Sequence, residues 1–319
     1  MKKLRNISLI AATSALALAA AGCAGEADPS STDDGGGAGG TVAFAALSLQ
    51  VPIVTQLGDA IEEYFTAAGY EYTVQDASFD ATTQAQQLQQ AIDNRSIVAA
   101  WIFPVSAEGI ASTLAYAQDA EIPVVIEAAP SDVGYDGAQS GIIFNSPDFT
   151  GFGEAIAEQT AACIAEKGVE DAQVLFLDTV DTSAGSGTVK AAIMETIEQA
   201  APDAEIVAEA QAGDITTAQE QVQQLLIANP DATVVIAGTD ETSLGAVNAY
   251  KAAGKQVDCI VGGGGNDDAL AAQESGEIDA VVAWDYSASV DNIGGDLLQL
   301  MEDPTAEGGV YELPFTVHD

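Results

Sequence analysis

From residue 41 to the end of the chain, short apolar runs alternate with longer stretches in which apolar residues recur every three or four positions. Runs such as 97–103 and 233–237 are almost wholly apolar, which is typical of strands buried on both faces of a parallel sheet. The longer stretches, such as 53–68, have the period of amphipathic helices. Because strands and helices alternate, the sequence predicts an α/β protein whose parallel sheets carry helices on both faces.

The alternation falls into two sets, each of a size that suits one lobe. The predicted strands are 41–47, 70–76, 97–103, 123–127 and 141–144, then 173–178, 205–209, 233–237, 259–261, 279–284 and 315–318. The predicted helices are 53–68, 81–93, 108–118, 149–167, 189–200, 217–228, 243–253, 268–273 and 290–301. This order predicts two doubly wound parallel-sheet lobes. In such sheets ligands bind beyond the carboxyl ends of the strands, so we expect the site in the loops that follow them.

The first 23 residues indicate export. Lys2, Lys3 and Arg5 precede an apolar run over 7–21 and then Cys23, which is the order of a secretory signal peptide, here 1–22. The run is too short and alanine-rich for a convincing membrane-spanning helix. Cleavage directly before a cysteine resembles the bacterial lipoprotein signal, which implies lipidation of Cys23 and an extracytoplasmic protein anchored to the cell membrane. An ordinary signal peptide with an unrelated cysteine is the alternative.

The segment that follows Cys23 predicts a tether. Residues 24–40 consist largely of Gly, Ala, Ser, Asp and Glu and contain almost nothing to bury, so a lipidated flexible linker over 23–40 is expected. About 280 residues remain, enough for two lobes of ordinary size.

The charge balance is extreme. The chain has 49 acidic residues against 8 basic ones and a net charge of −41. Three of the basic residues precede Cys23, which leaves 5 against 49, a net −44, and Arg95 as the one arginine. Such a surface repels phosphate backbones, so nucleic acid is excluded as a partner. A saline habitat and a generally acidic secreted surface both remain open explanations.

Two cysteines remain after Cys23. Cys163 falls in the middle of a predicted helix and Cys259 begins a predicted strand, both in the second set. An oxidising compartment permits a disulfide between them, but two buried free thiols fit the sequence as well.

The sequence offers little for catalysis. Its one histidine, His318, is at the C-terminus, so Ser-His-Asp and Cys-His chemistry lack a base. No His/Cys cluster has the spacing of a zinc site, and no acidic run follows the EF-hand pattern. The glycines of 262–265 do not have the spacing of a dinucleotide fingerprint and suit a tight turn better. We therefore expect a non-enzyme without metal or cofactor.

Several segments resemble the type I periplasmic binding proteins of the ribose- and galactose-binding kind. The first loop, Gln50-Val51-Pro52, and the Gln-rich helix 83–92 occur where that family has them. Most specific is the segment 239–246, TDETSLGA, with an Ala-Gly-Lys ending at Lys255. The resemblance covers residues 41–319 and rests on the order and spacing of the segments together.

The resemblance implies two lobes joined by three crossovers that close over one ligand. The crossovers are expected near Asn145-Ser146, Asp285-Tyr286 and Tyr311-Glu312. The N-terminal lobe is then 41–145 plus 286–311, and the C-terminal lobe is 146–285 plus 312–319. Closure is a hinge motion driven by ligand contacts to both lobes.

At the family's ligand-contact positions this sequence departs from the ribose pattern. Ile53 and Val54 stand where aromatic residues are expected, Glu127-Ala128 replaces an Asp-Arg pair, and 183–188 lacks the family's arginine. The candidate ligand-binding residues are Gln50, Phe103, Glu127, Ser183, Asp240, Asn266, Trp284 and Asp285. For Phe103 and Glu127 the alternatives are a core cap and a solvated strand end, and Asp240 suits a helix N-cap.

These residues favour a small neutral ligand. Trp284 and Phe103 offer aromatic faces, while carboxylates and amides offer hydrogen-bond partners to vicinal hydroxyls. Without arginine there is no fork for an anion, so a saccharide or polyol is expected, with an amine or nucleoside-like ligand as the alternative. The resemblance further implies a monomer that delivers its ligand to an ABC permease. A sensor for a membrane signalling partner is the alternative role.

Overall fold

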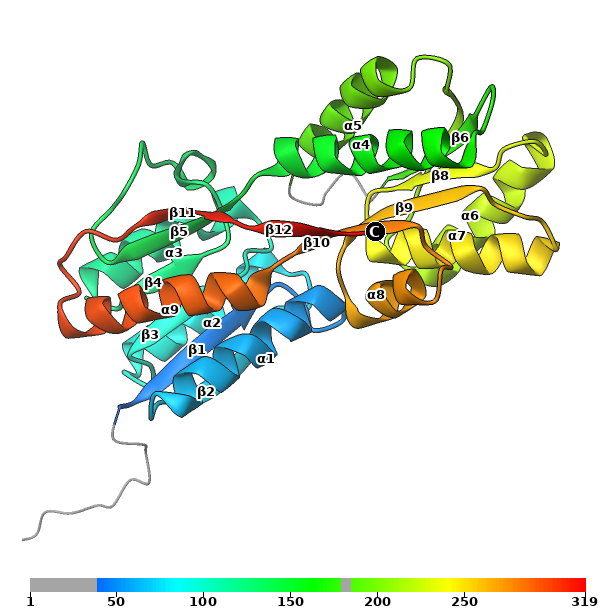
Figure 1. The fold of residues 1–319 in the computed structure, drawn as a ribbon. Coiled ribbons are helices and arrows are strands. Elements are labelled where there is room, and N and C mark those ends of the chain that lie inside the picture. Colours follow the sequence, from blue (N-terminus) through cyan, green and yellow to red (C-terminus); the bar gives the residue numbers. More distant parts are fainter. Residues whose placement is uncertain (1–38, 179–184) are drawn as a thin grey trace, which may run out of the picture. The chain divides into compact units, whose positions relative to one another are not determined.

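The computed structural model describes residues 39–178 and 185–319, which form two six-stranded sheets (Figure 1). The first sheet has the strand order β11-β5-β4-β3-β1-β2 and the second β12-β10-β9-β8-β6-β7. Neighbouring strands are parallel except at one edge of the second sheet, where β12 runs antiparallel to β10. The expected fold of two doubly wound parallel-sheet lobes is confirmed, with this one antiparallel edge strand.

The first sheet and the elements that accompany it make up the N-terminal lobe. Its strands are β1 (Thr41–Ala46), β2 (Glu71–Asp76), β3 (Ala99–Ile102), β4 (Val124–Ile126), β5 (Ile142–Pro147) and β11 (Val310–Leu313). Its helices are α1 (Pro52–Ala67), α2 (Ala81–Asp93), α3 (Ala107–Asp119), the 3₁₀ turn η1 (Pro130–Val133) and α9 (Tyr286–Glu302).

The second sheet and its helices make up the C-terminal lobe. Its strands are β6 (Gln173–Asp178), β7 (Glu205–Gln211), β8 (Val234–Ala237), β9 (Cys259–Gly264), β10 (Ala280–Trp284) and β12 (Phe315–His318). Its helices are α4 (Phe149–Lys167), α5 (Ser186–Ala200), α6 (Ile215–Ala228), α7 (Asp240–Ala253) and α8 (Asp267–Glu274).

The chain passes between the two sheets three times. It leaves the first sheet after β5, returns after β10 into α9, and leaves again after β11. The passages lie near the crossovers expected from the sequence. β5 and β11 end at Pro147 and Leu313, two residues beyond the expected lobe boundaries at 145 and 311. The lobe boundaries given above therefore stay a proposal.

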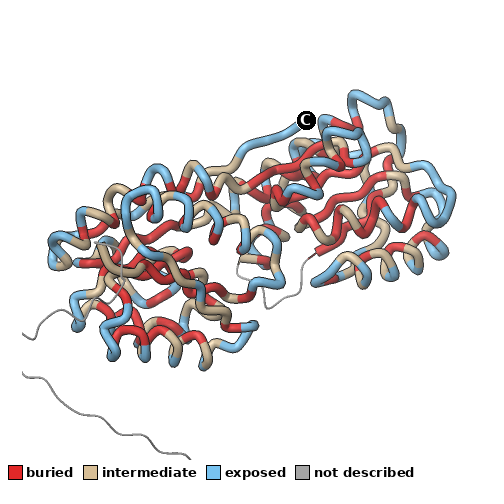
Figure 2. The backbone as a smooth tube through the Cα atoms, turned by 90° about the horizontal axis from the view of Figure 1, so that it is seen from below, coloured by how far each residue is buried: buried red, intermediate tan, exposed pale blue. Residues whose placement is uncertain are grey.

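Each sheet buries its central strands between two hydrophobic layers. In the first lobe α1 and α9 cover one face, where Trp101 and Leu297 lie, and α2 and α3 cover the other, where Ile102 and Leu114 lie. The second lobe repeats this arrangement with α4 and α5 opposite α6, α7 and α8. Figure 2 shows the central strands buried and the helices buried along one side only, whereas the edge strands β2, β7, β11 and β12 are more exposed. Burial on both faces explains why the central strands are continuous apolar runs.

Helix ends follow local signals. Asp80, Ser106 and Asp214 each accept a hydrogen bond from a backbone N–H in the first turn of the helix that follows. Gly168 and Gly254 end α4 and α7 in the left-handed conformation, which glycine adopts at little cost. These caps explain why most predicted helix boundaries lie within three residues of the observed ones.

Some boundaries expected from the sequence are wrong. Helix α9 begins at Tyr286, four residues before the expected 290, because Asp285 caps it. Helix α7 begins at Asp240 rather than 243, and its N-cap is Thr239, so Asp240 is not the cap. Strand β11 was expected only as a crossover, because it is short, partly exposed and on an edge.

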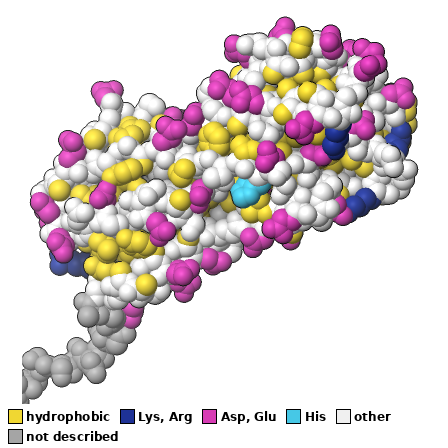
Figure 3. Space-filling view, viewed as in Figure 1, with side chains coloured by type: hydrophobic (Ala, Val, Ile, Leu, Met, Phe, Trp, Pro, Cys, Tyr) yellow, Lys and Arg dark blue, Asp and Glu magenta, His cyan; other side chains and the backbone are white. Residues whose placement is uncertain are grey.

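The surface of the protein is acidic. Acidic side chains are scattered over the face shown in Figure 3, whereas Lys and Arg appear at few places. Within the described residues, no helix is both long and apolar enough to cross a membrane.

Candidate ligand-binding site

The strand orders locate the expected site. In each sheet the order reverses once, between β1 and β3 in the first and between β6 and β8 in the second. Loops diverge at such a reversal and leave a crevice beyond the carboxyl ends of the strands. Gln50 follows β1 and Phe103 follows β3, while Asp240 follows β8. Ser183 follows β6 but lies outside the described residues.

Glu127, one residue beyond β4, is held inside the N-terminal lobe. Its side chain is 6% exposed and accepts hydrogen bonds from Trp101 Nε1 at 2.7 Å and from Asn145 Nδ2 at 3.0 and 2.8 Å. Burial raises the pKa of this carboxyl to about 7, although both hydrogen-bond partners favour the charged form. Glu127 is therefore not a solvated strand end, and its carboxyl is hydrogen-bonded within the lobe. A ligand contact at Glu127 stays a prediction.

Asp240, the first residue of α7 in the C-terminal lobe, is also buried and hydrogen-bonded within the protein. It is 4% exposed and accepts hydrogen bonds from the backbone N–H groups of Gly265 and Asn266, both at 2.8 Å. Burial raises its pKa to about 7, against the effect of these two donors, and the charge of Glu241 raises it further. The carboxyl ties the start of α7 to the loop after β9.

Gly262, Gly263 and Gly264 end β9 and only Gly265 lies beyond it, so most of the run is strand and not the tight turn that the sequence suggested. A Cβ on any of the four would lie less than 3.0 Å from a neighbouring atom. A Cβ on Gly263 would lie 2.7 Å from Ile156 Cδ1, and one on Gly264 would lie 2.3 Å from Asp240 Oδ2. Gly264 and Gly265 also have positive φ angles, +133° and +101°. The run thus brings the loop against Asp240, which explains the glycines without a bound phosphate.

Two further candidates cap helices. Asn266 accepts a hydrogen bond from the backbone N–H of Ala269 at 2.9 Å, and Asp285 accepts one from Ala288 at the same distance. Asn266 is buried, whereas Asp285 is partly exposed. The carboxylate of Asp285 is therefore more accessible to a ligand than the amide of Asn266.

The aromatic candidates lie at the ends of β10 and β3. Trp284 stacks on Phe152 with ring centroids 4.1 Å apart and planes 8° apart, and Phe149 and Phe315 pack edge-on against it. Phe103 packs against Tyr286, with centroids 6.1 Å apart. One face of the Trp284 indole is therefore occupied by Phe152, and the residue as a whole is partly exposed.

The loop after β1 is more open. Gln50 is exposed, and its backbone N–H is held by Ser48 Oγ at 3.2 Å. Further along, Gln56 Nε2 donates to Asp267 Oδ1 at 3.0 Å, which joins α1 of the first lobe to the start of α8 in the second. This loop therefore offers a free amide beside a link between the lobes.

One aromatic residue on this edge was missed by sequence reasoning. Phe79, in the loop after β2, is 55% exposed, and its backbone N–H donates to the carbonyl of Leu47 at 2.8 Å. Phe79 and Ser78 have φ angles of +64° and +48°, an unusual conformation for residues other than glycine. Nothing in the sequence signals this backbone, which depends on contacts with the neighbouring loop.

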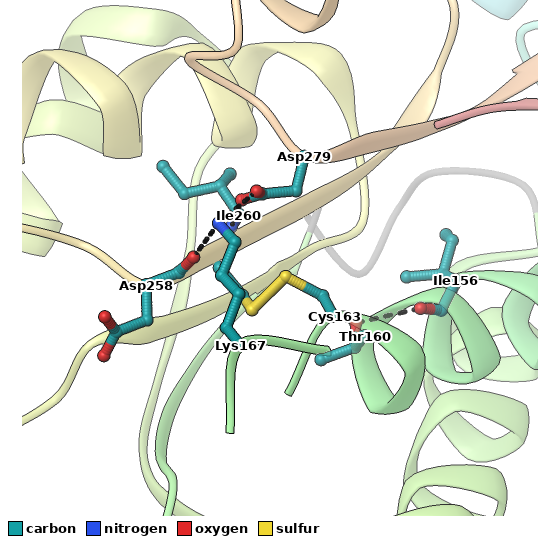
Figure 4. Close-up of a disulfide and its surroundings, with 8 residues drawn as sticks. Ile156, Thr160, Cys163, Lys167, Asp258, Ile260 and Asp279 are labelled. Carbon is teal, nitrogen blue, oxygen red and sulfur yellow. Dashed lines mark hydrogen bonds and ion pairs between the residues drawn. A yellow bond between two sulfur atoms is a disulfide. The ribbon is translucent and has the colours of Figure 1, made fainter. Parts of the chain in front are cut away.

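Cys163 and Cys259 form a disulfide that joins α4 to β9, with Cα atoms 6.1 Å apart (Figure 4). Beside it, Lys167 bonds to the Asp258 carbonyl and to Asp279, and Asp279 Oδ2 accepts a hydrogen bond from the Ile260 N–H at 2.8 Å. These contacts fix the strand that leads into the glycine loop.

The fold and the position of these loops define a class of protein, and sequence comparison identifies it. The profile of the periplasmic binding protein domain matches residues 42–295, so the chain belongs to this family. The ribose import binding protein RbsB of Bacillus subtilis is 25% identical over 244 residues, which cover 76% of this chain and 75% of that protein. The corresponding protein of Haemophilus influenzae is 26% identical over 247 residues, covering 76% and 79%.

Solved structures share the fold. A periplasmic solute-binding protein of an ABC transporter from Actinobacillus succinogenes, with bound D-allose, superposes with a TM-score of 0.75 at 19% identity, covering 88% of this chain and 97% of that one. The Caulobacter myo-inositol binding protein gives a TM-score of 0.71 at 19% identity, with 87% and 92% covered. At this identity the likeness shows the fold and leaves the ligand to be argued from the site.

Proposed function

We propose that this protein is the extracytoplasmic solute-binding component of an ABC importer and that it captures a neutral saccharide or polyol. Family membership supports the general role, and the relatives named above bind ribose, D-allose and myo-inositol. We infer a monomer that meets a permease and has no catalytic role.

The composition of the loops at the carboxyl ends of the strands is the observation that supports a neutral ligand. The segments 47–51, 103–106, 179–184, 238–239 and 265–266 contain no Lys or Arg. An anionic ligand would lack a charged partner there, whereas hydroxyl groups can bond to the amide of Gln50 and the carboxylate of Asp285. The aromatic ring of Trp284, a partly exposed residue, suits the C–H surface of a sugar ring.

A thermal-shift screen of the chain from residue 24 onward tests this proposal. The panel contains D-ribose, D-allose, L-arabinose, myo-inositol and glycerol. Primary amines and nucleosides are included to represent the alternative ligand classes. A ligand present at 100 times its Kd stabilises the folded chain by about 2.7 kcal/mol, so a true ligand raises Tm clearly. If only amines or nucleosides raise Tm, the saccharide assignment is wrong.

Paired glutamine variants locate the site. Q50A is expected to weaken binding of the panel member with the largest shift roughly five- to tenfold, because one ligand hydrogen bond is lost. Q86A removes an exposed glutamine on α2, away from the strand ends, and should leave the affinity unchanged. Equal affinities of Q50A and the parent chain would remove Gln50 from the site.

We further propose that Cys23 is lipidated and anchors the protein to the outer face of the cell membrane. The sequence pattern of residues 1–23 supports this, and these residues lie outside the described part of the chain. In a bacterial host the parent chain should sediment with membranes and carry the mass of a diacylglyceryl group, whereas C23A should do neither. A parent chain without added mass contradicts the proposal.

A further inference from the structure

The carboxyl group of Glu127 lies buried inside the N-terminal lobe, and no cation among the described residues pairs with it. The side chains of Trp101 and Asn145, which bond to Glu127, are fully buried and neutral. Tyr286, the first residue of α9, is buried as well, and burial together with the charge of Glu127 raises the pKa of its phenol. The elements packed around Glu127 thus contribute two uncharged donors and one phenol.

The composition of the chain leaves no other counter-charge. The four lysines after Cys23 all belong to the C-terminal lobe, where Lys167 pairs with Asp279 and Lys251 with Glu277. Arg95 precedes β3, at the amino end of that strand, whereas Glu127 follows the carboxyl end of β4. Burying an unpaired carboxylate is costly, and a proton is the remaining means of neutralising it.

The same carboxyl interacts with residues at two of the three passages between the lobes: it accepts hydrogen bonds from Asn145, and its charge acts on Tyr286. Asn145 lies in β5, just before the chain leaves the first sheet, and Tyr286 follows Asp285, where it returns. Asn145 Oδ1 is buried and has no hydrogen-bond partner, so Glu127 is the group that holds this amide in place. Any change at Glu127 therefore acts on residues at both crossovers.

We propose that Glu127 is a proton-binding site at the hinge, and that loss of its proton loosens the two crossovers that Asn145 and Tyr286 belong to. The pKa of about 7 places this change within an ordinary range of environmental pH. Because the folded chain holds the proton more tightly than the unfolded chain, its stabilising effect is complete below the pKa of an ordinary glutamic acid and is lost as the pH rises through about 7. An effect of this proton on how long the ligand is retained rests on the proposed function. The proton site itself does not depend on that function.

Tryptophan fluorescence tests the proton site without a ligand. The chain has two tryptophans, so W284F leaves only Trp101, whose indole N–H donates directly to Glu127. Between pH 5 and 9 the W284F mature chain should show one transition with its midpoint near 7. The transition should vanish in W284F/E127Q and persist in W284F/D240N, since Asp240 also titrates near 7 but lies in the other lobe.

A second pair of measurements covers the case in which W284F does not fold. Subtracting the titration of W101F from that of the parent chain isolates the signal of Trp101 and should give the same midpoint. A transition that survives E127Q, or the absence of any transition, overturns the proton site.

Hydrogen exchange tests the effect on the hinge. After correction for the intrinsic pH dependence, backbone amides around 145–146 and 285–287 should exchange up to about tenfold faster at pH 8 than at pH 6 in the parent chain. E127Q, which can keep the bond to Trp101 and turn the Asn145 amide to face its own, should show no such change. Equal pH dependence in both chains overturns the effect on the hinge. Failure of every saccharide to bind would bear on the proposed function alone.

Discussion

Removing the disulfide with C163A/C259A is expected to lower the free energy of unfolding by about 4 kcal/mol and Tm by roughly 10 °C. The bond closes a segment of 96 residues, so the unfolded chain gains much conformational freedom when it is absent. It also joins α4 to the strand that leads into the glycine loop and Asn266. Calorimetry of the double variant and the parent chain measures both effects.

Reduction provides the matched control for this prediction. A reductant should lower the Tm of the parent chain toward that of C163A/C259A and leave the Tm of the variant unchanged. If the free energies of unfolding of the parent chain and C163A/C259A differ by less than about 1 kcal/mol, the disulfide contributes little to stability.

The second large effect is expected at Trp284. W284A should cost about 3 kcal/mol of folding free energy, because it removes a ring that stacks on Phe152 and packs edge-on to Phe149 and Phe315. The ring also packs against core residues of both lobes. The same variant should abolish the rise in Tm that a bound saccharide produces, since the remaining indole face is the proposed platform for the ligand.

W284F separates the two roles of this residue. A phenyl ring keeps most of the stacking on Phe152, so W284F should lose only about 1 kcal/mol while still weakening saccharide binding. The contrary outcome is that W284A unfolds at a lower temperature yet binds the saccharide, below its Tm, as tightly as the parent chain does. In that case Trp284 is a packing residue and its assignment as a ligand contact is wrong. Unchanged stability would instead contradict the stacking argument.

The buried acids give this binding protein an unusual framework. Glu127 directly follows β4 and Asp240 begins α7 after β8, and both carboxyl groups are hydrogen-bonded within their own lobe. A ligand therefore meets a surface whose polar groups are partly held by the protein, and contacts from exposed groups such as Gln50 become more important. Two of the polar groups assigned from the resemblance are thus hydrogen-bonded within the protein itself.

The sequence predicted elements well where one local signal decides them. β8 is a run of four buried apolar residues, and α2 begins after a capping aspartate, Asp80. Strand β11 and the first turn of α9 were missed, because the edge strand is partly exposed and the capping role of Asp285 was not anticipated. The candidate residues were placed correctly at the carboxyl ends of strands, but their internal bonds could not be anticipated.

By itself the sequence determined the alternation of strands and helices, the two-lobed architecture and the shortage of positive charge, since periodicity and composition are properties of the chain alone. The tertiary structure decided which polar groups are free to meet a ligand. Glu127 is engaged by Trp101, 26 residues earlier, and Asp240 by Gly265, 25 residues later. Such partners come together only when neighbouring strands pair, so no local pattern separates a buried, bonded acid from an open one.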